Sequence, residues 1–97
     1  MKRIPILTPG EILLTEFIRP NHLTVYRVAK DSGISQPTLQ LIVTGKRGIT
    51  ANTALRLGLY FGIDAQFWLN LQSEYDLRLA KAKNFPRLEK EVYPLAA

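Results

Sequence analysis

The sequence predicts an all-α protein in which five helices form one domain. Its 97 residues are enough for a single small domain. One helix-start signal recurs five times between Leu7 and Trp68: an apolar residue, then a Thr, Ser or Asp that can cap the first turn, then an apolar residue four positions after the cap. The apolar residues of the predicted helices follow the helical period, as Leu13 with Phe17 and Ala54 with Leu57 and Phe61 show.

The first predicted helix spans residues 9–19. Thr8 is its N-cap, Pro9 occupies the first helical position, and Glu11 completes a capping box with Thr8. Pro20 ends the helix because its ring removes a backbone N–H donor.

The second and third predicted helices, 25–32 and 36–44, are short and follow one another closely. Thr24 caps the former and Ser35 caps the latter. The two helices are separated by only about three residues, beginning at Gly33.

The fourth and fifth predicted helices span residues 51–61 and 65–82, with Thr50 and Asp64 as their N-caps. Three of the predicted helices end at glycines that can adopt a left-handed backbone conformation. These glycines are Gly33, Gly45 and Gly62.

A C-terminal tail is predicted after the helical domain. The domain is expected to span residues 1–83 and the tail residues 84–97, because the helical pattern fails after Lys83 and a proline follows at Pro86. We expect this tail to be mobile, or to become ordered only with a partner.

Two short helices joined by a glycine-containing turn are typical of the DNA-binding helix-turn-helix. Here the turn is Gly33-Ile34-Ser35, and Ala29 is small where the two helices would cross. The apolar residues expected to form the seam between the helices are Val28, Ile34, Leu39 and Ile42. The alternative interpretation is an ordinary helical hairpin in a small bundle.

The third helix would enter the major groove with its N-terminal residues at the base edges. Gln36 and Gln40 are predicted to pair with adenine, and Leu41 to contact a thymine methyl group. The predicted DNA-facing set on this helix is Ser35, Gln36, Thr38, Gln40, Leu41 and Thr44. For each glutamine, a solvated helix surface is the alternative.

Lys46 and Arg47 follow this helix between two glycines, where a backbone phosphate would pass. Thr24 and Tyr26 are further candidates for phosphate contact. Residues 21–50 contain four basic residues and one acidic residue, so they carry +3 of the net charge of +5. This concentration of charge favours nucleic acid as a partner, although solvated loop cations are the alternative for the glycine-flanked pair.

Composition excludes several other kinds of site. The chain has no cysteine and a single histidine, His22, so disulfides, thiol nucleophiles and His- or Cys-rich metal centres are excluded. Glu74 and Asp76 could be taken for a pair of catalytic carboxylates, but on a helix their side chains would point about 200° apart. We therefore expect no cofactor, no metal and no enzymatic activity.

The sequence also predicts no membrane span. The longest run of apolar residues and glycines, 57–63, is too short for a bilayer, which needs about 20 residues.

A helix-turn-helix reads one DNA half-site, so useful affinity favours a two-fold dimer. The fifth predicted helix carries an apolar stripe that is broader than a small core needs. The residues predicted to form a homodimer interface are Phe67, Leu71, Tyr75 and Leu79. Trp68 is assigned to the core, and packing of the whole stripe within one chain is the alternative.

The chain resembles the HigA-type antitoxins, a branch of the phage-repressor-like helix-turn-helix regulators, in three stretches: TPGEILLTEFI, GKRGITANTALRLGLYFG and FWLNLQSEYDLR. The resemblance implies a cytoplasmic antitoxin that neutralises a HigB-type toxin, a ribosome-dependent messenger-RNA endonuclease. It also implies a dimer that binds double-stranded operator DNA and represses its own operon. The family pattern places Ser35, Gln36, Thr38, Gln40, Lys46 and Arg47 in the DNA-facing stretch.

Two departures from the family pattern affect this stretch and the first cap. Thr8 stands where the family often has His, and Thr44 stands where Asn often precedes Gly-Lys-Arg. A stand-alone transcriptional repressor with no toxin is the alternative function. It would use the same DNA-facing residues, so residues 25–47 do not distinguish the two functions.

Overall fold

A computed structural model describes residues 7–96 of the protein. Within this range the regular structure is entirely helical, which confirms the predicted all-α class. The elements in chain order are α1 (Pro9–Leu13), the π-helical turn η1 (Leu14–Ile18), α2 (Val25–Ser32), α3 (Gln36–Val43), α4 (Ala51–Phe61) and α5 (Ala65–Glu91). Residues 1–6 and Ala97 of the predicted domain and tail lie outside the described range.

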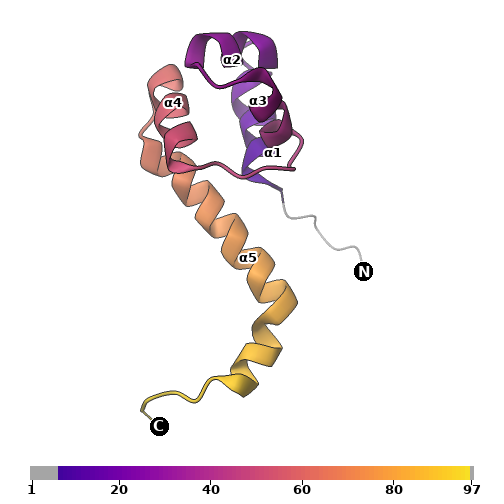
Figure 1. Ribbon diagram of the computed structural model, residues 1–97, viewed down its shortest axis with the longest axis vertical. Helices are drawn as coiled ribbons and strands as arrows, with labels where there is room; N and C mark the ends of the chain where they lie inside the picture. Colours follow the sequence, from indigo (N-terminus) through magenta and orange to yellow (C-terminus); the bar gives the residue numbers. More distant parts are fainter. Residues whose placement is uncertain (1–6, 97) are drawn as a thin grey trace.

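Four helices gather at one end of the molecule, and the fifth runs away from them. Figure 1 shows α1 to α4 grouped together, with α5 starting beside α4 and extending past the group. This helix gives the molecule its elongated extents of 53 × 34 × 21 Å. No helix in the described part of the chain is long and apolar enough to cross a membrane.

All five predicted N-caps are confirmed. Each capping side chain accepts a hydrogen bond from a backbone N–H of the first turn, which stabilises the helix by about 1 kcal/mol. At α1 the capping box is complete: Glu11 N donates to Thr8 Oγ1 over 3.2 Å, and Thr8 N donates to Glu11 Oε1 over 2.8 Å. The caps in chain order are Thr8, Thr24, Ser35, Thr50 and Asp64.

The three predicted glycine stops are also confirmed. Gly33, Gly45 and Gly62 have φ angles of 77°, 79° and 71°, in the left-handed region that glycine adopts at low cost. After α3, Lys46 N donates to the carbonyl of Leu41 over 2.9 Å, which closes the end of the helix.

The first helix differs from the single span 9–19 predicted from sequence. It changes at Leu14 into a π-helical turn, and Arg19 N donates to the carbonyl of Leu14, five residues back. Pro20 contributes to this irregular end because it cannot donate the next helical hydrogen bond. The wider turn accompanies the packing of Phe17 against Trp68, with ring centroids 4.8 Å apart.

The core lies between α1, η1, α2, α3 and α4, and the first turns of α5 close it against α1 and α4. Its largest fully buried side chains are Trp68, Leu13, Ile18, Leu39, Ile42, Leu57 and Val28. Ala29 and Ile34 are also buried, so every member of the predicted seam between α2 and α3 lies inside the protein. The crossing angle of the two helices is thus set by packed apolar side chains.

The predicted end of the fifth helix near residue 82 is wrong, and so is the irregular structure expected from residue 84 to residue 91. The helix α5 continues to Glu91 with Pro86 inside it. A proline inside a helix removes one backbone hydrogen bond, and it can bend the helix without ending it. Arg87 lies 3.3 Å from Glu91 and supports the turn after the proline. In Figure 1 the last turns of α5 leave the direction of the preceding ones.

Candidate nucleic-acid interface

The turn between α2 and α3 is held by both neighbouring helices and by α4. Gly33 N donates to the carbonyl of Ala29, and Ser35 begins α3 as its cap. From α4, Arg56 Nη1 donates to the carbonyl of Ser32 over 3.2 Å. The turn needs glycine for its backbone angle, and a Cβ at Gly33 would also lie 2.5 Å from the same guanidinium nitrogen, so the flexible end of Arg56 would have to move.

Arg56 is a contributor to the site that sequence reasoning missed. It lies 24 residues from Ser32 in the chain, and Asn52 Oδ1 holds its guanidinium from within α4 at 3.0 Å. A basic residue one turn into an amphipathic helix gives no signal of such a contact, because the partner is a backbone carbonyl on another element.

The two glutamines predicted to read bases lie exposed on one side of α3. Neither Gln36 nor Gln40 uses its side-chain amide in a hydrogen bond within the described part of the chain. Leu41 is 38% exposed on the same helix. The buried face of α3, with Leu39 and Ile42, points the other way, so these three side chains are available to a groove.

The hydroxyl groups predicted at this interface already have partners inside the protein. Ser35 Oγ donates to Thr38 Oγ1 over 2.8 Å, and Thr44 Oγ1 donates to the carbonyl of Gln40 over 2.8 Å. Thr24 Oγ1 accepts from Arg27 N over 3.0 Å as the cap of α2. These hydroxyls therefore shape the ends of α2 and α3, and they keep only part of their hydrogen-bonding capacity for DNA.

The structure brings the loop of Lys46 and Arg47 close to the first turn of α3. Lys46 and Arg47 are exposed in the segment after α3, and Arg47 Nη1 donates to Thr38 Oγ1 over 3.5 Å. This long contact places the guanidinium beside the first turn of α3. Within residues 7–96, neither cation lies within ion-pair distance of a carboxylate, so both charges are available to phosphates.

At the start of α2, Tyr26 is 59% exposed and Thr24 is exposed beside it. The charge of Arg27 is directed elsewhere, because its Nε lies 2.6 Å from Asp31 Oδ2. The hydrogen bond from Arg27 lowers the pKa of the Asp31 carboxyl. Tyr60 OH also donates to Asp31, over 3.3 Å, and burial raises the pKa of this phenol.

The predicted dimer residues lie mainly toward the body of their own chain. Leu71 packs on the core, and Phe67 is 37% exposed with its ring 6.0 Å from that of Phe17. Tyr75 and Leu79 are half-buried further along α5. The structure therefore packs Leu71 against the core and leaves Phe67, Tyr75 and Leu79 partly exposed to a partner.

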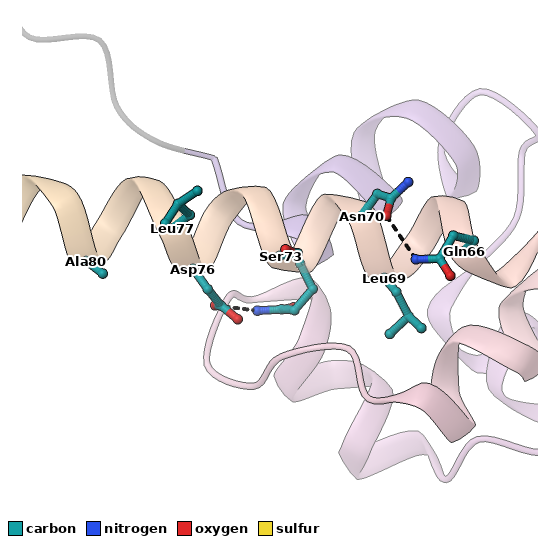
Figure 2. A pocket seen from close by; sticks show the side chains of 8 residues that line it. Gln66, Leu69, Asn70, Ser73, Asp76, Leu77 and Ala80 are labelled. Carbon is teal, nitrogen blue, oxygen red and sulfur yellow. Dashed lines mark hydrogen bonds between the residues drawn. The ribbon is translucent and has the colours of Figure 1, made fainter. Parts of the chain in front are cut away.

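Another face of α5 carries an open hollow of about 660 Å³. Figure 2 shows Leu69, Ser73, Leu77 and Ala80 along it, with Asp76 at one side. Leu77 is 58% exposed, so this face also presents apolar surface to solvent.

The chain is similar to known helix-turn-helix proteins. Residues 15–68 match the helix-turn-helix family model. The chain is 49% identical over 78 residues to virulence-associated protein I of Dichelobacter nodosus, covering 80% of this chain and 72% of that protein.

Two solved structures of HigA proteins are similar to this chain over nearly its whole length. The Pseudomonas aeruginosa antitoxin HigA, solved with the higBA promoter, has 45% identity and a TM-score of 0.89, with 94% of this chain and 99% of that chain covered. An addiction module antidote protein of a HigA family from Coxiella burnetii has 41% identity and a TM-score of 0.87, with 94% and 99% covered.

Proposed function

Since the chain belongs to the HigA family of helix-turn-helix antitoxins, we propose that it binds the operator DNA of its own operon as a dimer and neutralises a HigB-type toxin. Members of this family act by binding, and they are not enzymes. The proposed toxin is a messenger-RNA endonuclease in the cytoplasm. The proposed function therefore requires that the chain bind both DNA and a second protein.

One observation carries the DNA-binding part of the proposal. The amides of Gln36 and Gln40, which have no hydrogen-bond partner among residues 7–96, and the cations of Lys46 and Arg47 lie on neighbouring segments of one surface. A similar chain, the Pseudomonas aeruginosa antitoxin HigA, was solved with the higBA promoter, which supports DNA binding by the present chain.

The residues of this surface would have two roles in DNA binding, reading bases and binding phosphates. Gln36 and Gln40 would donate to and accept from adenine in the major groove, and Leu41 would contact a thymine methyl group. Lys46 and Arg47 would bind phosphates and set the register of α3 without reading sequence. The predicted secondary contacts would add phosphate hydrogen bonds at the edges: the hydroxyls of Thr38 in α3 and of its caps Ser35 and Thr44, and those of Thr24 and Tyr26 at the start of α2.

The charge distribution along α5 supports a two-fold dimer. Residues 64–76 contain three acidic residues and no basic residue, whereas residues 78–87 contain four basic residues and no acidic residue. Antiparallel pairing across a two-fold axis would place the acidic segment of each copy beside the basic segment of the other. Tyr75 and Leu79 lie near the crossover between these segments and would form the apolar centre of the interface.

The DNA and toxin parts of the proposal have separate tests. A footprint of the purified chain on the promoter of its own operon should protect two half-sites related by two-fold symmetry. Co-expression with the protein encoded by the adjacent gene should relieve growth arrest, and the two proteins should co-purify. Protection of DNA without relief of arrest would favour the stand-alone repressor, and a lack of protection would remove the DNA function.

A further inference from the structure

The side chain of Gln72 connects α5 to the loop that carries Lys46 and Arg47. Gln72 Oε1 accepts a hydrogen bond from Ile49 N over 2.8 Å, across 23 residues of sequence. Gln72 Nε2 donates to Asp76 Oδ1 over 2.9 Å, one turn along α5. Figure 2 draws this second bond as the dashed line at Asp76. Because both ends of the amide are bonded, its orientation is fixed.

The loop is shaped to lie against this amide. A Cβ at Gly48 would stand 3.0–3.1 Å from three atoms of the Gln72 amide, so a larger residue would disturb the contact. Ile49 is only 4% exposed, and its N–H would be left unpaired in a buried position without Gln72. At the other end of the loop, a Cβ at Gly45 would stand 3.1 Å from Thr8.

The same polar connection continues into the recognition helix. Arg47 Nη1 donates to Thr38 Oγ1, which also accepts from the Ser35 hydroxyl at the cap of α3. The loop is thus held by α5 on one side and touches the first turn of α3 on the other.

We propose that Gln72 is a positioning residue for DNA binding, which holds the loop of Lys46 and Arg47 in place for the phosphates that flank the base-reading helix. This inference rests on the proposed DNA-binding function. A loop that is already fixed loses less conformational freedom when DNA binds, so its phosphate contacts contribute more of their strength to affinity. Gln72 itself is not expected to touch the DNA.

The test compares two substitutions on α5. Gln72→Met keeps the length of the side chain and removes both hydrogen bonds. Gln66→Met is the matched control, because the Gln66 side chain bonds to Asn70 on the same helix. For each protein we would measure amide hydrogen exchange at Ile49, and affinity for operator and for unrelated DNA over a series of salt concentrations.

Gln72→Met should speed exchange at Ile49 and lower operator affinity about tenfold, as expected for weakening a charge-assisted hydrogen bond to phosphate. The slope of log affinity against log salt should fall by about 0.9 for each phosphate that the loop no longer neutralises. Affinity for unrelated DNA should fall by the same factor as affinity for operator, since phosphates carry no sequence information. Gln66→Met should leave all of these quantities unchanged.

A conservative pair of substitutions separates positioning from general stability. Gln72→Glu alone keeps an oxygen that accepts from Ile49 N, but its second oxygen would face the Asp76 carboxylate. Adding Asp76→Asn replaces that carboxylate with an amide that can donate to the new glutamate. The double variant should recover the salt slope of the unmodified chain.

The inference is overturned if Gln72→Met speeds exchange at Ile49 while affinity and salt slope stay unchanged. It is also overturned if the double variant restores exchange protection but not the slope. Failure of the unmodified chain to bind its operator at any salt concentration would instead remove the proposed function on which the inference rests.

Discussion

Gly10 lies where α1 crosses α3, and replacing it with alanine tests how α3 is held in place. A Cβ built on Gly10 would lie 1.6 Å from the carbonyl oxygen of Ile42 and 2.4 Å from its carbon. Both residues are buried. Because real Cβ atoms do not approach such atoms closer than 3.0 Å, the backbone of α1 or of α3 must move by more than 1 Å.

Two opposing effects determine how much stability Gly10→Ala loses. Alanine favours a helix over glycine by about 1 kcal/mol. Overpacking in a core costs about 1–3 kcal/mol, and Gly10→Ala belongs at or above the upper end because the obstacle is backbone and not a flexible side chain. We therefore expect Gly10→Ala to lower the free energy of unfolding by about 2 kcal/mol or more.

The control is Gly62→Ala, measured in parallel by urea denaturation. A Cβ at Gly62 meets no atom within 4 Å, so only its φ of 71° opposes alanine, at a cost of about 1 kcal/mol. Operator affinity of the folded fraction should fall with Gly10→Ala, since α3 is displaced, and should stay unchanged with Gly62→Ala. An equal or smaller loss of stability for Gly10→Ala than for Gly62→Ala would refute the described contact between α1 and α3.

Three further predictions concern the surfaces. Gln36→Ala and Gln40→Ala should each weaken operator binding by about 1–3 kcal/mol with little effect on unrelated DNA, measured by fluorescence anisotropy; equal losses on both DNAs would exclude base reading. Lys46→Ala or Arg47→Ala should weaken binding to all DNA and reduce the salt slope by about 0.9 each, and an unchanged slope would remove that residue from the phosphate contacts. Leu79→Glu should give folded monomers by light scattering and circular dichroism, whereas a dimeric variant would place the interface elsewhere.

The helix boundaries were largely predictable because their causes are local. A capping side chain and its N–H partner lie within three residues, as at Thr24 and Arg27. A left-handed stop such as Gly62 depends on the backbone of one residue. Windows of five or six residues therefore contain most of the physical information that starts and ends α2, α3 and α4.

The features that sequence reasoning missed depend on contacts between distant parts of the chain. Arg56 meets the carboxyl end of α2 across 24 residues, and Gln72 meets the loop after α3 across 23 residues. The continuation of α5 past Pro86 depends on whether flanking turns compensate for one missing hydrogen bond. Proline has two structural outcomes in a helix, a bend or an end, and the residue type alone does not select one.

The predicted interface stripe illustrates the same distinction. Periodicity grouped Phe67, Leu71, Tyr75 and Leu79 on one side of a helix. It could not assign each residue to the core or to a partner, because that depends on where the body of the protein ends along α5. The structure places Leu71 against the core and leaves Leu77 exposed on another part of the helix.

The central claim is that α3 and the loop after it form the DNA-binding surface. Its most direct test is a titration of the nitrogen-15-labelled chain with a duplex of its own promoter, followed by nuclear magnetic resonance. We predict that the largest shift changes fall at Gln36, Gln40, Lys46 and Arg47, with smaller changes at Thr24. Shift changes confined to α5, with residues 35–47 unaffected, would contradict the account.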